Sequence, residues 1–534
     1  MKKYISIIAV LFTIGISGCK KDYLSLEANP NSPSVTTPEF TLTAALNDAA
    51  FSFQSEYIQH NIWAGYWTAS GNYTPNLATN QYQFTGSTFD GTSAIFVSPG
   101  AWVLLYSNLT NLNNLQKLSS TDPANANFQA IATIMKAYDF ELLVDEYNDV
   151  PYTQAFQPST ILFPAYDKAS DIYHDLGKQL DAAIALINKN TGATNPGGSD
   201  IVFKGNMASW KKFANSIKLR LAIHVSTNTP NDPLVTDLAS TAGEGYLDET
   251  LSATSNPGYT NTKASSGALQ QNPFWALFGL DVNSNPAIFN PQYRANAFSV
   301  AMLKSFNDPR ITQFYAPVTG IPATPTVQGN LFGNTTKTLQ PNALTSGVGP
   351  GLLQSPSQDA IFFSGAESLF LQAEAALKGY ITGNAQTLYQ RGITASFVQV
   401  QAGGTYVPAA VGFTPITPGF TYTAPATAAA SAALATTYYN QNINNVGWAA
   451  STNKLQAIAT QKYIALNGLF PLEAYDEYWR TGFPNLPSSI DPGAISATLP
   501  RRIYYPTSEI TSNGANLAKE GTINPFTSKI FWTK

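Results

Sequence analysis

The chain has 534 residues, of which 44% are hydrophobic and 12% aromatic, so its apolar surface can offset the conformational entropy lost on folding, and a disordered chain is excluded. Charged residues make up only 12%, about half of the roughly 25% usual for soluble domains, which predicts a polar but nearly uncharged surface. The chain has 29 basic and 33 acidic residues, and its basic residues form no dense cluster, so we do not expect a nucleic-acid partner. The three histidines lie far apart in sequence, so we do not expect a zinc site.

Residues 1–18 are typical of a secretion signal, with two lysines before a largely apolar run and small residues before the single cysteine. The run is too short to span a bilayer comfortably, and no later segment approaches roughly 20 consecutive apolar residues. The tetrad Ile16-Ser17-Gly18-Cys19 resembles the bacterial lipobox. This resemblance implies that the signal is cut before Cys19 and that its sulfur carries the lipid that anchors the protein to the membrane.

Residues 19–37 are predicted to be a lipidated tether, because Pro, Asn and Ser dominate its second half and favour an extended chain. Its start, Lys20-Lys21-Asp22, resembles the short signals that send lipoproteins to the outer face of the outer membrane in the Bacteroidetes phylum. We therefore expect the protein at the cell surface. Pro38 favours the start of a helix, and we assign residues 38–534 to one domain.

Helical patterns dominate that domain. Between residues 128 and 147, apolar side chains recur at steps of three and four, which indicates an amphipathic helix. Similar stripes occur at about 39–60, 100–118, 166–188, 206–226, 363–379, 384–400, 430–444 and 453–478. Many are joined in couples by short linkers, and the couple at 363–400 is typical of a tetratricopeptide repeat. The predicted fold is mostly α, with tetratricopeptide-like helix pairs that form a superhelical scaffold.

Two long excursions interrupt the helical pattern, near residues 228–360 and 402–428, where Pro, Gly, Asn, Ser and Thr replace the apolar stripes. Loops of this length inside a compact protein are uncommon unless they carry function. The excursions are therefore the first place where we expect a ligand surface.

Aromatic residues with amide neighbours suit sugar binding, because C–H faces of sugars stack on rings while amides bond hydroxyls. Segment 61–84 has this composition, and segment 267–286 is a second such place. We take Trp67, Tyr73, Tyr82 and Trp275 as the candidate ligand-binding residues. Helix packing does not obviously claim these rings, although a packing role is the alternative for each one.

Two groups of oxygen-bearing side chains have spacings that could suit metal binding or acid chemistry. Asp281, Asn283 and Asn285 alternate as in the first half of a calcium loop, but Pro286 stands where the turn glycine is needed, which favours an Asx-rich turn. The acidic cluster at 139–149 (Asp139, Glu141, Asp145, Glu146 and Asp149) is interpreted as a solvated or capping helix face. We expect no bound metal.

The sequence contains no Gly-x-Ser-x-Gly elbow, Walker loop, dinucleotide fingerprint or His-Glu-x-x-His helix. We therefore expect no catalytic residues and no cofactor. Paired carboxylates of a glycoside hydrolase are harder to exclude, because sequence spacing does not show which carboxylates face one bond.

Five segments in order resemble the SusD/RagB family of nutrient-binding lipoproteins, in particular its divergent SusD-like branch: 138–156, 207–224, 366–379, 458–484 and 499–516. Within them, Trp210 and Phe213 fit a helix core, and Glu367 and Glu374 a polar helix face. The resemblance implies a lid-like helical protein with four tetratricopeptide-type pairs. It also implies a partner, a TonB-dependent outer-membrane transporter of the SusC type, to which captured nutrient is delivered.

Several functions are compatible with these patterns. The favoured ligand is an oligosaccharide, but the family also includes oligopeptide binders. A surface glycan hydrolase and a purely structural adhesion scaffold also stay open, since both share the anchor and the helical repeats.

Overall fold

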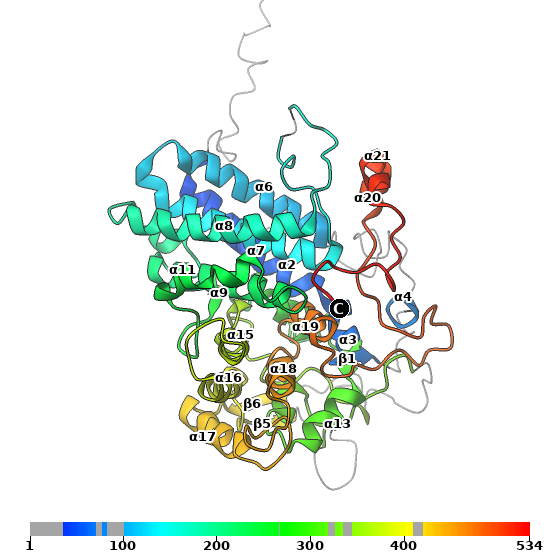
Figure 1. The fold of residues 1–534 in the computed structure, drawn as a ribbon. Helices are drawn as coiled ribbons and strands as arrows, with labels where there is room; N and C mark the ends of the chain where they lie inside the picture. Colours follow the sequence, from blue (N-terminus) through cyan, green and yellow to red (C-terminus); the bar gives the residue numbers. More distant parts are fainter. Residues whose placement is uncertain are drawn as a thin grey trace, which may run out of the picture.

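Helices make up most of the regular structure (Figure 1). The computed structural model describes residues 36–70, 77–82, 101–157, 159–265, 267–318, 326–334, 344–408 and 420–534. Its longer helices are α2 (Pro38–Glu56), α6 (Ala101–Ser120), α7 (Ala126–Tyr147), α8 (Ala169–Lys189), α9 (Met207–Ser226), α13 (Ala297–Ser305), α15 (Gly365–Leu377), α16 (Ala385–Gln399), α17 (Ala428–Tyr439), α18 (Lys454–Ala465) and α19 (Pro471–Thr481). The shorter ones are α3 (Ile58–Trp63), α4 (Leu77–Gln81), α10 (Pro233–Thr236), α11 (Leu238–Thr241), α12 (Pro273–Phe278), α14 (Ile311–Phe314), α20 (Thr507–Ser512) and α21 (Gly514–Leu517).

The long helices stack in chain order. Helix α2 packs on α6, α6 on α7, α7 on α8 and α8 on α9, and α9 leads to α15, which packs on α16 and α18. In Figure 1 the α6–α9 layer lies above the layer of α15–α18. Consecutive helices with short linkers, such as α6 with α7 and α15 with α16, lie against each other as couples. The predicted helical, tetratricopeptide-like scaffold is confirmed.

Side-chain caps explain where several of these helices begin. The residue before the helix accepts a hydrogen bond from a backbone N–H of the first turn at Asn206 (α9), Ser364 (α15), Asn384 (α16) and Asn453 (α18). Each cap satisfies a donor that the helix itself leaves without a partner. Short polar side chains before an apolar stripe therefore set the boundaries of the helix pairs.

Two predicted stripes are each divided into two helices. The stripe at 453–478 is broken after Ala465, where Gly468 adopts a left-handed φ of 72° and Pro471 begins α19. A proline at that position lacks the N–H that would continue an earlier helix. The stripe at 39–60 is likewise divided at Tyr57 into α2 and α3.

Among the residues that the structure describes, the strands are short and form two-stranded sheets. They are β1 (Trp67–Ala69), β2 (Ala253–Ser255), β3 (Tyr293–Ala295), β4 (Ala360–Phe363), β5 (Thr405–Pro408) and β6 (Phe420–Ala424). The antiparallel pairs are β1 with β3, β2 with β4, and β5 with β6. The excursion at 228–360 contributes β2 and β3. These strands pair with β4, which leads into α15, and with β1, and so attach the excursion to the helical scaffold.

Buried apolar side chains form one contiguous cluster from Leu42 to Trp532. The chain returns to its first helix layer near residue 532, since the amide of Asn228 donates to the carbonyls of Trp532 and Thr533 at 3.0 Å each. Within the part of the chain that the structure describes, no helix combines the length and apolar character that crossing a membrane needs.

Candidate ligand-binding surface

Trp67 lies in the core and not in a loop. It is the first residue of β1 and is only 1% exposed. Its ring packs against Phe278 at 4.9 Å between ring centroids, with Phe274 and Tyr293 slightly farther away. The expectation that packing leaves this ring free is wrong, because pairing with β3 turns Trp67 toward an aromatic cluster of the 267–295 segment.

Tyr82 is also buried, with 0% exposure. Its hydroxyl accepts a hydrogen bond of 2.8 Å from the backbone N–H of Ser489, and its ring meets Phe332 and Phe526 edge-on. Burial raises the pKa of Tyr82 to about 12. Residues remote in sequence therefore pack around this ring and bury it as well. Tyr73 lies outside the described residues.

Trp275 keeps a half-buried ring, and it is the candidate whose position best agrees with a surface role. The side chain of Asn272 accepts from the backbone N–H of Trp275 at 3.0 Å and so begins α12. The indole N–H donates to the carbonyl of Leu280 at 2.9 Å. Gly279 lies against the ring, since a Cβ there would come within 2.7 Å of it. The indole is thus held in one orientation with part of its surface uncovered.

The predicted Asx-rich turn follows α12. The carboxylate of Asp281 accepts from the backbone N–H groups of Asn283 and Asn285, both at 2.8 Å, and from the Asn285 amide at 3.3 Å. These hydrogen bonds lower the pKa of Asp281. The oxygen-rich spacing is explained by the turn itself.

A groove runs between α6, α7 and the segment that follows α7. It consists of two neighbouring cavities of about 330 Å³ and 460 Å³. The walls of both include Asn113, Lys117, Phe156 and Gln157. Sequence reasoning missed this groove, although the amide-rich run at 111–116 on α6 and the aromatic residues at 152–156 were a usable signal. A further cavity of about 410 Å³, between α15, α16 and β4, has no aromatic ring in its wall.

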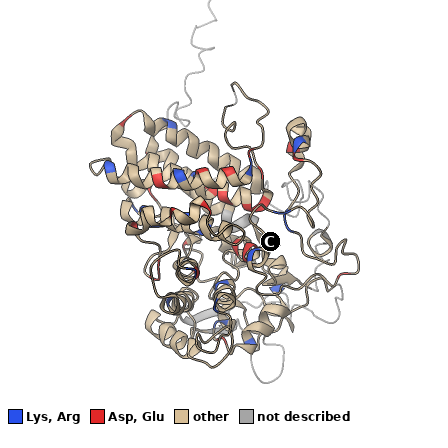
Figure 2. Cartoon of the chain, in the orientation of Figure 1, with Lys and Arg blue, Asp and Glu red and all other residues tan. Residues whose placement is uncertain are grey.

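The acidic cluster of α7 is not a solvated face. Asp139, Glu141, Asp145, Glu146 and Asp149 are all buried. Asp149 does cap a helix, because its carboxylate accepts from the backbone N–H of Ala169 at the start of α8 at 2.9 Å. The correction follows from the packing of α7 against α2, α6, α8 and α9, which covers the sides that carry these acids. Figure 2 shows several acidic segments, coloured red, in the α7–α8 layer, while most of the ribbon is uncharged.

Buried cations pair with these acids. The guanidinium of Arg220 on α9 binds Glu141 through two hydrogen bonds and Glu367 of α15 through a third, at 2.5–2.9 Å. Arg480 of α19 binds Glu374 in the same bidentate way. Glu367 and Glu374 therefore do not form the expected polar face. They are interior anchors that join helices, and buried charges of this kind require such partners.

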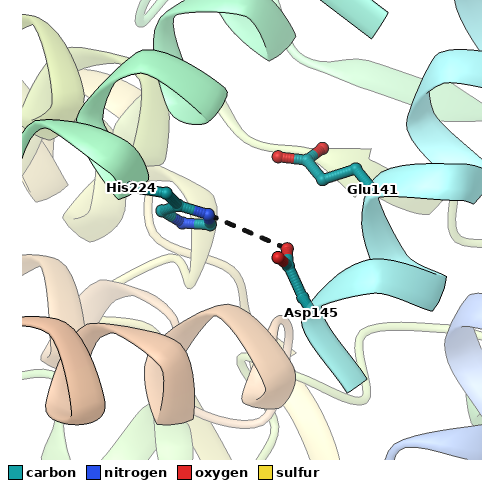
Figure 3. Close-up of side chains that lie close together, drawn as sticks. All are labelled: Glu141, Asp145 and His224. Carbon is teal, nitrogen blue, oxygen red and sulfur yellow. Dashed lines mark ion pairs between the residues drawn. The ribbon is translucent and has the colours of Figure 1, made fainter. Parts of the chain in front are cut away.

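Three buried side chains come close enough to suggest a metal centre: Glu141, Asp145 and His224, with ligand atoms within 4.8 Å of one another (Figure 3). Their atoms are already engaged. Arg220 occupies both oxygens of Glu141, and Asp145 accepts from Tyr173 and from the indole of Trp532. A cation here would have to displace a guanidinium, so the donor set fits an ion-pair network and not a metal site.

The electrostatics of the network follow from burial. Burial raises the pKa of Asp145 to about 7, partly opposed by His224. Burial disfavours the charged form of His224, but Glu473, with an oxygen 3.2 Å from its Nε2, and Asp145 outweigh this and raise its pKa. Asp145 and Glu141 are buried, whereas glycoside hydrolysis requires two carboxylates that reach one glycosidic bond.

Comparison with protein families assigns the class. A family described as "Starch-binding associating with outer membrane", SusD-like, matches residues 30–506. Because this match spans most of the sequence, the chain belongs to the SusD-like family, as the five ordered segments predicted. No curated protein matches the chain.

Solved structures share the fold. A chitin-binding SusD homologue from Flavobacterium johnsoniae is 23% identical, with a TM-score of 0.67 over 92% of this chain and 98% of its own. A SusD homologue from Bacteroides fragilis is 18% identical, with a TM-score of 0.70 over 94% and 100%. An outer-membrane protein from Bacteroides vulgatus, titled as probably involved in nutrient binding, is 19% identical, with a TM-score of 0.71 over 93% and 100%.

Proposed function

We propose that the protein is a cell-surface lipoprotein that captures an oligosaccharide and delivers it to a TonB-dependent outer-membrane transporter of the SusC type. The observation that carries this proposal is the family match over residues 30–506, whose description joins carbohydrate binding with the outer membrane. The chitin-binding homologue of the same fold agrees with a glycan ligand. Attachment through lipid on Cys19, which lies outside the described residues, completes the proposal.

The ligand surface that we propose includes Trp275. The backbone N–H of Trp275 binds Asn272, its indole N–H binds Leu280, and the residue stays partly exposed. A rigid, partly exposed ring costs little conformational entropy when a sugar stacks on it. Tyr73 remains a candidate of the same surface, whereas buried Trp67 and Tyr82 would support it from the core.

We further propose that the protein binds and does not cleave its ligand. Glu141 is engaged by Arg220, Asp145 by Tyr173 and Trp532, and Asp149 by the N-terminus of α8. A general acid must instead reach the bond that it protonates.

Two experiments test this function. The purified protein is screened against neutral glycans, including starch and chitin oligosaccharides, and against oligopeptides, with chromatographic analysis of the glycans afterwards. We expect a glycan to bind and to remain intact. A ligand set restricted to peptides, or cleavage of a bound glycan, would contradict the proposal. Separately, tagged protein isolated from gently solubilised outer membrane should bring a TonB-dependent transporter with it, and the same tag on an unrelated surface lipoprotein should not.

A further inference from the structure

The groove between α6 and α7 contains an ammonium group without a counter-charge. Lys136 of α7 is half-buried and lines the 330 Å³ cavity. Its Nζ donates to the amide oxygens of Gln116 at 2.7 Å and Asn113 at 3.3 Å. Within the described residues, no carboxylate oxygen lies within 4.0 Å of this nitrogen, and the second cation in the cavity wall is Lys117.

Two other buried lysines of this protein do have carboxylate partners. Lys218 contacts the carboxylates of Asp181 and Asp237, and Lys462 contacts those of Glu473 and Glu477. Taking a charge out of water is unfavourable unless an opposite charge compensates it. Burial, together with Lys117, accordingly lowers the pKa of Lys136 to about 8. The unusual feature of this cavity is an ammonium group without a carboxylate partner. The nearby carboxylate of Glu509 lies in the wall of the second cavity and accepts from Tyr166 and Asn513.

Phe156 lies at the junction of the two cavities, in the wall of both. Its backbone has a left-handed φ of 62°, which is uncommon and strained for a bulky residue. Its ring lies 5.5 Å from Lys136 Nζ and 6.3 Å from the ring of Tyr106. The strained backbone thus places an apolar ring directly beside the uncompensated ammonium group.

We propose that this groove is a second saccharide site, specific for a sugar that carries a carboxylate. The carboxylate binds Lys136 and Lys117, and the sugar ring covers Phe156. The amides of Asn113 and Gln157 serve its hydroxyls, and the chain continues into the 460 Å³ cavity. An ammonium–carboxylate hydrogen bond is about twice as strong as a neutral one, so a neutral sugar would leave the main feature of the site unused. The inference takes from the proposed function only that the ligand is a saccharide, and the site is separate from Trp275.

The first test is calorimetric titration of the purified protein at pH 7 with trigalacturonate and, in parallel, with maltotriose. We expect trigalacturonate to bind, and Lys136→Met to weaken it by about tenfold or more, the loss expected when one charge-assisted contact is removed. Lys117→Met, at an exposed position whose change leaves the core intact, should weaken it too. Lys304→Met on α13 removes the same charge elsewhere and should leave binding unchanged.

Several results would overturn the proposal. They are no trigalacturonate binding, binding that survives both Lys136→Met and Lys117→Met, equal competition by sodium sulfate alone, or a triglutamate peptide that binds as tightly with the same lysine dependence. The two proposals fail separately. Trp275→Ala should leave trigalacturonate affinity intact, whereas a failed screen with neutral glycans speaks against the proposed function and leaves this site standing.

The second test uses pH and distinguishes binding from a structural role of Lys136. The titratable groups in the wall of the same cavity are Lys136, Lys117 and Tyr152, whose hydroxyl donates to Asp175 of α8. Glu509 lies in the wall of the adjoining cavity. Because Lys136 of the free protein loses its charge as the pH rises through about 8, trigalacturonate affinity should fall between about pH 7 and pH 9.5. Lys136→Arg remains charged there and should retain more of its affinity at the higher pH. Equal loss in both proteins would contradict the assignment.

Discussion

The guanidinium of Arg480 donates two hydrogen bonds of 2.6 Å to the carboxylate of Glu374, and so joins α19 to α15 across 106 residues of sequence. Both side chains are 1% exposed. Arg480 also contacts Glu477 on its own helix at 2.8 Å, so one guanidinium compensates two buried carboxylates. The contact between these helices is therefore specified by charge as well as by apolar packing.

Replacing Arg480 with Met should destabilise the protein strongly. The change leaves Glu374 and Glu477 buried without this partner, and removing one member of a buried pair costs about 3–5 kcal/mol. The measurement is the free energy of unfolding from urea titration. Arg501→Met is the control, since the half-buried Arg501 lies on the Trp479 ring at 4.3 Å and should cost about 1 kcal/mol or less. Equal losses in the two variants would contradict the assigned role of the pair.

Asp139 should make stability depend on pH. Burial raises its pKa to about 8, against an ordinary value of 3.8, although a hydrogen bond from Asn108 opposes this. The native state thus keeps a proton that the unfolded chain releases, and the free energy of unfolding falls as pH rises from about 4 to about 8. Asp139→Asn should flatten this slope and stabilise the protein at pH 8 by on the order of 1–3 kcal/mol.

The comparison for Asp139→Asn is the urea midpoint of both proteins at pH 5 and at pH 8. Some slope should remain, because burial also raises the pKa of Asp145 and of Glu367 to about 7. A variant that is less stable than the parent at pH 8, with an unchanged slope, would show that Asp139 is ionised in the native protein.

Trp275→Ala should weaken binding of the neutral glycan found in the screen by roughly 1–3 kcal/mol, the value of removing a large ring from water. Folding should survive, since the ring is only half-buried. Calorimetric titration with parallel thermal melts measures both quantities. Tyr439→Ala on α17 is the matched aromatic control and should bind normally; normal binding by Trp275→Ala itself would place the ligand elsewhere.

Trp67→Ala should have the opposite profile. Its ring fills space between Phe278, Phe274 and Tyr293, and truncating a buried tryptophan costs about 3–5 kcal/mol. The unfolding midpoint in urea should fall well below that of Trp275→Ala. A mild effect on stability combined with lost ligand affinity would show instead that Trp67 contacts the ligand.

Cys19→Ala tests the anchor. Because Cys19 is the only thiol and follows Ile16-Ser17-Gly18, we expect the variant to carry no acyl chain and to leave the membrane fraction. Mass spectrometry of the wild-type N-terminus is the decisive measurement. Mature wild-type protein without acyl groups would refute lipidation at this residue.

Periodicity predicted the helical scaffold well, because apolar side chains recur at helical spacing in α7, α15 and α16. Burial of the acids was not predictable from spacing. Glu141 and Glu367 become interior only because Arg220, far from both in sequence, reaches the same point. The candidate aromatic residues differ in burial for the same reason. The partners of Trp67 and Tyr82 come from distant segments, whereas Trp275 is fixed by Asn272 and Leu280 nearby.

The indole N–H of Trp532 donates to the carboxylate of Asp145, and the carbonyls of residues 532 and 533 accept from Asn228. Helices α7 and α9 are made several hundred residues earlier than these partners. The long sequence separation of these contacts makes their closure slow, because loop-closure entropy must be lost before they form. A variant without residues 530–534 would lack both the indole donor of Asp145 and the carbonyl acceptors of Asn228.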